Sequence, residues 1–101
     1  MILAVSFIVE MARLLFDYFP LLLGLGAIIS IISIGIGRTE GWSISDSLYF
    51  GFITATTVGY GDMRPTLVAS KFLAIILAIM GVIFTGIIVA IAVEVASRIH
   101  A

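Results

Sequence analysis

Two long blocks without charged side chains constrain this sequence more than any other feature. Residues 18–37 carry no Asp, Glu, Lys or Arg, and residues 72–93 form a second such block that is rich in Ile, Val and Ala. A helix rises about 1.5 Å per residue, so a block of twenty residues reaches about 30 Å, the thickness of the hydrocarbon core of a bilayer. The sequence therefore predicts two membrane-spanning helices.

The composition agrees with a membrane protein and argues against several soluble classes. Hydrophobic residues make up 62% of the 101 residues, charged residues only 11%, and the net charge is -1. Such a chain has no basic surface for a nucleic-acid backbone, and without cysteine it has no disulfide or thiolate metal site. Its single His leaves little for a catalytic cluster. We therefore expect no nucleic-acid partner, no enzymatic activity and no organic cofactor.

A third apolar segment lies between the two blocks, at residues 47–61. Its fifteen residues are too few to cross a bilayer as a helix. A segment of this length enters and leaves by the same face, which a membrane tolerates where irregular backbone is buried in protein or lines a watery cavity. The expected fold is all-α, with two transmembrane helices flanking a re-entrant segment.

The first residues carry an apolar stretch of a different kind. Residues 1–9 lack the basic start of a signal peptide. Glu10, Arg13 and Asp17 share one helical face, which predicts an amphipathic segment. Two interpretations remain open: the segment lies along the membrane surface, or it extends the first span as a tilted helix.

The central segment begins with helix-start signals. Ser43 or Ser45 can cap a helix, and Asp46 then lies in its first turn, where the helix dipole favours a negative charge. We expect a short helix over residues 45–56. Its carboxyl end, with several unpaired carbonyls and the negative end of the dipole, favours a cation within the membrane.

The residues after this helix have an unusual backbone preference. Gly59 and Gly61 adopt positive φ at little cost, whereas Val58 and Tyr60 favour negative φ. This alternation turns successive carbonyls the same way and leaves the Val58 and Tyr60 side chains packed behind the backbone. Buried carbonyls without donors are costly, and a dehydrated cation can pair with them.

The run Thr56-Thr57-Val58-Gly59-Tyr60-Gly61-Asp62 resembles the selectivity filter of potassium channels. With its flanking helices, the chain resembles the pore domain of prokaryotic two-transmembrane potassium channels over residues 14–99. The resemblance implies that K⁺ is coordinated by backbone carbonyls and by the Thr57 hydroxyl, and that Gly61 and Asp62 support the filter. The coordinating residues are Thr57, Val58, Gly59 and Tyr60.

The same resemblance implies an assembly and a location. One loop per chain requires four copies to encircle an ion, so we expect a homotetramer that conducts K⁺ passively across the cell membrane, with both termini cytoplasmic. The single pore domain, residues 1–101, then divides into an N-terminal amphipathic segment (1–13), an outer helix (14–37), a pore helix (45–56), a filter (57–62) and an inner helix (67–99).

Two glycines of the second span have alternative interpretations. Gly81 matches the hinge glycine of the inner helix in the family, and Gly86 lies five residues further on. Glycine weakens a helix by about 1 kcal/mol relative to alanine, which favours bending at a gate. Glycine also allows close packing between membrane helices. Hinge and packing both remain open.

The resemblance also assigns a cavity and inner gate to one face of the second span, formed by Val82, Thr85, Val89 and Val93. The Thr85 hydroxyl either contacts hydrated ions or bonds to a carbonyl of its own helix. Four copies of Glu94 either form an acidic ring at the inner mouth or remain solvated.

Two positions depart from better-known family members. Phe50 replaces a Trp that donates a hydrogen bond to the filter, and Tyr49 is the candidate substitute. Ile53 replaces a Glu that pairs with the filter aspartate, so we expect Asp62 to face Arg64 or water. A less selective cation channel is therefore an alternative function, and a structural two-helix membrane protein is a second. Because the sequence ends soon after the second span, two interpretations remain open: a natural minimal channel, or the pore of a longer protein with a cytoplasmic regulatory domain elsewhere, which we favour.

Overall fold

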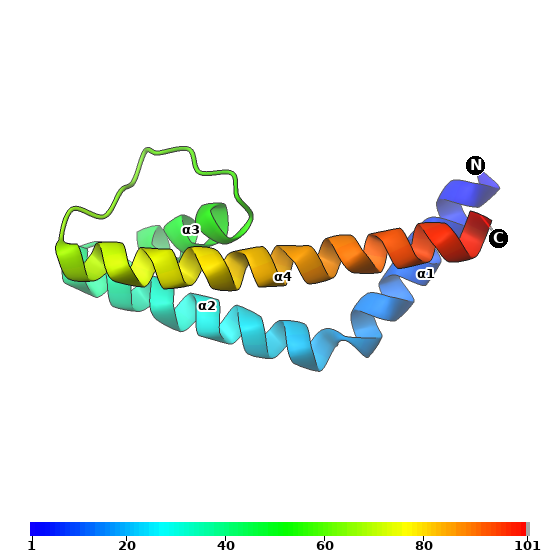
Figure 1. The fold of residues 1–101 in the computed structure, drawn as a ribbon, viewed down its shortest axis with the longest axis horizontal. Helices are drawn as coiled ribbons and strands as arrows, with labels where there is room; N and C mark the ends of the chain where they lie inside the picture. Colours follow the sequence, from blue (N-terminus) through cyan, green and yellow to red (C-terminus); the bar gives the residue numbers. More distant parts are fainter. Residues whose placement is uncertain (101) are drawn as a thin grey trace.

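The computed structural model describes residues 1–100, which fold into four helices and, over that range, no strand. They are α1 (Ile2–Asp17), α2 (Phe19–Glu40), α3 (Ile44–Ala55) and α4 (Val68–His100). Figure 1 shows α2 and α4 side by side, α3 beside them at one end, and α1 along the carboxyl-terminal part of α4. Both α2 and α4 are long and apolar enough to cross a membrane. The all-α fold with two apolar spans is therefore confirmed.

The helix boundaries differ from expectation mainly at the first span. The outer helix, expected over residues 14–37, begins at Phe19 and ends at Glu40. A break at Tyr18 separates it from α1. Pro20 occupies the first turn of α2, where backbone N–H groups have no partner within the helix, so the N–H that proline lacks costs no hydrogen bond. Gly41 ends α2 in the left-handed conformation, with φ 80°. The pore helix and inner helix each begin and end one residue away from the expected bounds.

The N-terminal segment is a full helix that packs on α4. It was expected over residues 1–13, but α1 extends to Asp17 and continues into α2 after a single residue. Glu10 and Arg13 form an ion pair of 3.3 Å on it. Figure 1 shows the amino terminus, where α1 begins, next to the carboxyl end of α4. Whether α1 lies along the membrane surface or forms a tilted extension of the first span stays a prediction.

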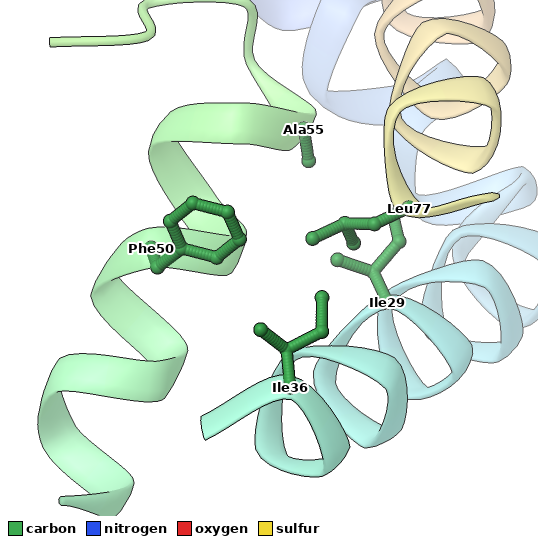
Figure 2. Packing of buried hydrophobic residues seen from close by; sticks show 5 residues of the cluster. All are labelled: Ile29, Ile36, Phe50, Ala55 and Leu77. Atoms are coloured by element: carbon green, nitrogen blue, oxygen red, sulfur yellow. The ribbon is translucent and has the colours of Figure 1, made fainter. Parts of the chain in front are cut away.

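A small hydrophobic core holds the three remaining helices together (Figure 2). Much of the apolar surface lies outside this core: Phe52 and Phe72, for example, are each 67% exposed. A water-soluble monomer rarely exposes so much contiguous apolar surface. The single chain therefore has large faces that suit lipid or further copies of itself. The core residues are Ile29, Ile36, Phe50, Ala55 and Leu77.

Serine and glycine pairs bring α3 close to α2. A Cβ atom added at Gly51 would overlap the Ser33 side chain, and one added at Gly37 would overlap Ser47. Both serines are buried, and their hydroxyls donate to carbonyls of their own helices. Small residues at an interface let helix backbones approach closely in a membrane. The pore helix is therefore seated directly against the outer helix.

Glu40 joins the end of α2 to the start of α4. Its carboxylate accepts hydrogen bonds from the Thr66 N–H at 3.0 Å, the Thr66 hydroxyl at 2.9 Å and the Leu67 N–H at 3.0 Å. Amide groups at a helix start lack partners within the helix, and the dipole there favours a negative charge. The two ends of the segment that contains α3 are thus fastened together.

Candidate functional site

The start of α3 is capped as the sequence predicts. Ser43 is the capping residue: its hydroxyl oxygen accepts a hydrogen bond from the Asp46 N–H at 3.1 Å. Asp46 lies in the first turn, where the positive end of the helix dipole favours its carboxylate. Local sequence therefore accounts for where α3 begins.

The carboxyl end of α3 differs from expectation. Several unpaired carbonyls were expected there, but each of the last five carbonyls before the filter accepts a hydrogen bond. The expectation is wrong because the chain folds back beneath the helix end and threonine hydroxyls supply further donors. The bonds are Phe52 O from the Thr56 N–H and hydroxyl, Ile53 O from the Gly59 N–H, Thr54 O from the Thr57 N–H, Ala55 O from the Thr85 hydroxyl, and Thr56 O from the Thr57 hydroxyl.

The backbone after α3 alternates in hand. Gly59 has φ 56° and Gly61 has φ 78°, as expected, whereas Val58 and Tyr60 are not at positive φ. Thr57 also has a positive φ, 63°, which the sequence did not predict and which is rare for a β-branched residue. Its N–H bond to Thr54 and its hydroxyl bond hold it in place. Every second residue from Thr57 to Gly61 is thus left-handed.

The filter residues lie on the surface of the single chain. Tyr60 is 71% exposed and Val58 is 50% exposed in the single chain, so the packing of these side chains behind the backbone stays a prediction for the assembled protein. None of the hydrogen bonds described for residues 1–100 is accepted by the carbonyls of residues 57–60. These oxygens remain available to a ligand.

Tyr49 is the side chain that supports the loop. Its hydroxyl donates to Asp62 Oδ2 at 3.0 Å, so Asp62 faces Tyr49, where Arg64 or water was expected. Desolvation raises the pKa of Tyr49 above its ordinary value of 10.0, and the hydrogen bond and charge of Asp62 raise it further. The phenol therefore stays protonated and continues to donate.

The two positions that depart from better-known family members are buried in the single chain. Phe50 is 5% exposed and Ile53 is 4% exposed, and both belong to the buried core. Trp42 packs on Phe50 with ring centroids 5.2 Å apart. Neither Phe50 nor Ile53 supplies a polar contact to the loop.

The inner helix contacts the end of α3 through two residues of one face. The Thr85 hydroxyl donates to the Ala55 carbonyl at 2.7 Å. Its bond therefore goes to α3, and to neither of the two expected partners, a hydrated ion or a carbonyl of its own helix. One turn earlier, a Cβ at Gly81 would lie 2.9 Å from Ala55 O, whereas one at Gly86 would meet nothing within 4 Å. Gly81 therefore permits close packing on α3, while a hinge role for Gly81 or Gly86 stays a prediction.

The remaining inner-helix candidates are exposed in the single chain. Glu94 forms an exposed ion pair with Arg98 at 3.1 Å, which is a weak interaction in water. In an acidic ring of Glu94 side chains, Arg98 would therefore neutralise part of the negative charge. The exposed valines on this helix are Val82, Val89 and Val93, at 60%, 55% and 63%.

Comparisons with known proteins agree with this geometry. A model of the family described as "Ion channel" matches residues 18–98. The human potassium voltage-gated channel subfamily A member 5 is 49% identical over 41 residues, or 41% of this chain and 7% of that protein. Two-pore potassium channel 1 of Arabidopsis thaliana is 43% identical over 49 residues, or 48% of this chain and 13% of that protein. The chain thus spans a small part of these relatives. No solved structure matches it at a comparable level.

Proposed function

The chain belongs to the ion channel family, and on that premise we propose that four copies of it form a potassium-selective pore. The observation that carries the proposal is the alternating backbone hand at Thr57, Gly59 and Gly61. Alternation aims successive carbonyls to one side of the chain, where they can replace the water that K⁺ sheds.

The pairing of the carbonyls supports the same mechanism. The five carbonyls that precede the filter accept hydrogen bonds, while those of residues 57–60 have no donor among residues 1–100. Carbonyls buried in a membrane need a positive partner, and a dehydrated cation supplies one. Each copy contributes one strand of oxygens, so a closed ring around the ion requires several copies, and four is the number in potassium channels.

The pore acts passively in this proposal. K⁺ moves down its gradient through the cell membrane, both termini lie in the cytoplasm, and no catalysis is involved. Exposed apolar side chains such as Phe52 and Phe72 face lipid or neighbouring copies in the tetramer.

The test is ionic selectivity after reconstitution. The purified chain is inserted into planar bilayers with K⁺ on one side and Na⁺ on the other, and the reversal potential is measured. We expect a value close to the K⁺ equilibrium potential. A reversal potential near zero identifies the less selective cation channel, and a dimer without current identifies the structural two-helix protein.

The Tyr49 bond to Asp62 gives a narrower prediction. Tyr49→Phe removes the hydroxyl and leaves Asp62 to water, so the outer end of the filter is held less firmly. A hydrogen bond of this exposed kind is worth about 1 kcal/mol, and we expect the permeability of Na⁺ relative to K⁺ to rise about threefold to tenfold.

The matched control is Tyr18→Phe, which removes the same group from the break between α1 and α2. It should leave the reversal potential of the unaltered channel in place. Equal Na⁺ permeability in the Tyr49→Phe and Tyr18→Phe channels would mean that the Tyr49 bond does not support selectivity.

A further inference from the structure

Thr85 differs from every other donor at the carboxyl end of α3. The carbonyls of residues 52–54 and 56 accept bonds from residues 56–59, which belong to the same continuous segment. The Ala55 carbonyl accepts its bond from Thr85, thirty residues further along the chain on α4. The inner helix thus supplies one cap of the pore helix from outside.

The surroundings of Thr85 fix this bond in place. Gly81 lies one turn earlier on α4, and its missing side chain allows the Ala55 backbone to approach closely. Ala55 is 5% exposed, and Thr85 is partly buried. The hydroxyl is therefore presented to the carbonyl by two helices in close contact, and not by a mobile loop.

We propose that Thr85 is a positioning residue that sets how strongly the carboxyl end of α3 attracts a permeating cation. Its hydroxyl donates a hydrogen bond to the Ala55 carbonyl oxygen, and the hydroxyl hydrogen offsets part of the negative potential there. This inference rests on the proposed potassium-channel function. The negative end of a helix dipole favours cations, and the number of its carbonyl lone pairs already engaged determines how much of that effect remains.

The size of the effect follows from the assembly. One hydroxyl dipole shifts the potential at a nearby ion only slightly, but the four copies act on the same ion and their effects add. A channel that lacks all four hydroxyls should bind K⁺ more tightly on the inner side of the filter. We expect the K⁺ concentration that gives half-maximal single-channel current to fall by roughly two- to fivefold.

The experiment compares Thr85→Val with Thr85→Ser. Valine keeps the shape and removes the hydroxyl, whereas serine keeps the hydroxyl and removes a methyl group. Single-channel currents are recorded in symmetrical KCl over a wide concentration range, and half-saturation is fitted separately from maximal current. The half-saturating concentration should fall in Thr85→Val and should be restored in Thr85→Ser.

Two further variants keep the test decisive. Thr85→Ala removes the same hydroxyl without the bulk of valine, in case the valine channel does not assemble. Ile83→Val deletes one methyl group from an exposed position of α4 and controls for general effects on that helix. A half-saturating concentration that is unchanged or raised in both Val and Ala variants overturns the inference, while the unaltered channel still conducts K⁺. An unaltered chain that passes no K⁺-selective current overturns the proposed function first.

Discussion

Replacing Gly59 by alanine is expected to reduce K⁺ flux roughly 100-fold or more without unfolding the helices. Gly59 has φ 56°, and a Cβ there would meet no atom of the same chain within 4 Å. The effect therefore comes from the backbone. A non-glycine residue in the left-handed region costs about 1–2 kcal/mol, and four copies share one ring, so the combined penalty on the conducting geometry is about 4–8 kcal/mol.

Gly41→Ala is the matched control for this prediction. Gly41 also has a positive φ, 80°, with no atom near its Cβ position, but it ends α2 and lies outside the filter. Its replacement carries similar local strain. Both proteins are reconstituted at equal tetramer content, and K⁺ efflux from vesicles is measured. Similar efflux from the Gly59→Ala and Gly41→Ala proteins would show that residue 59 does not contribute to the pathway.

Local sequence determines the parts of this fold that were predicted well. Uncharged blocks specify the spans of α2 and α4, because hydrocarbon thickness and helix rise leave little choice. Ser43 and Asp46 specify the start of α3 through a cap and a dipole. The glycines at 59 and 61 specify left-handed backbone because other residues are strained there.

Contacts between distant residues account for most of what was missed. The Thr85 bond to Ala55 and the Glu40 bonds to Thr66 depend on how α2, α3 and α4 pack, and neither pair has a sequence pattern of its own. Of the carbonyls at the end of α3 that were expected to be unpaired, only that of Ala55 is filled for this reason, because the others accept bonds from the nearby residues 56–59. The left-handed Thr57 is also determined by surrounding bonds, since its own side chain disfavours that conformation.

The break at Tyr18 was missed for a different reason. Leu14, Leu15 and Phe16 extend the apolar pattern toward the first span, so the outer helix was expected to begin at residue 14 although Asp17 interrupts the pattern. Pro20 was a usable signal, because proline favours the first turn of a helix and restricts the residue before it. Reading it as a helix start places the boundary within a residue or two of Phe19.

The comparison of Gly81 with Gly86 separates packing from hinge bending in the inner helix. By intrinsic propensity, alanine at either position should stabilise α4 by up to about 1 kcal/mol. Gly86→Ala should follow this expectation, because its Cβ meets nothing within 4 Å. Gly81→Ala should not, because its Cβ would lie 2.9 Å from Ala55 O and 3.0 Å from Ala55 Cβ. Backbone of α3 cannot rotate away as a flexible side chain can.

We therefore expect Gly81→Ala to destabilise the protein by about 1–3 kcal/mol per copy, as overpacked positions do, and to disturb the attached filter. Thermal unfolding of the detergent-solubilised protein and the reversal potential in a K⁺/Na⁺ gradient measure the two effects. A pure hinge predicts something else: Gly81→Ala assembles with normal thermal stability and normal selectivity, and only its open probability falls. A loss of thermal stability therefore indicates a packing role, whereas a fall in open probability at normal stability indicates a hinge. Because Thr85 lies on the same face, a shift of Ala55 away from residue 81 should also lengthen the Thr85 bond, so packing predicts that Gly81→Ala lowers the half-saturating K⁺ concentration as Thr85→Val does.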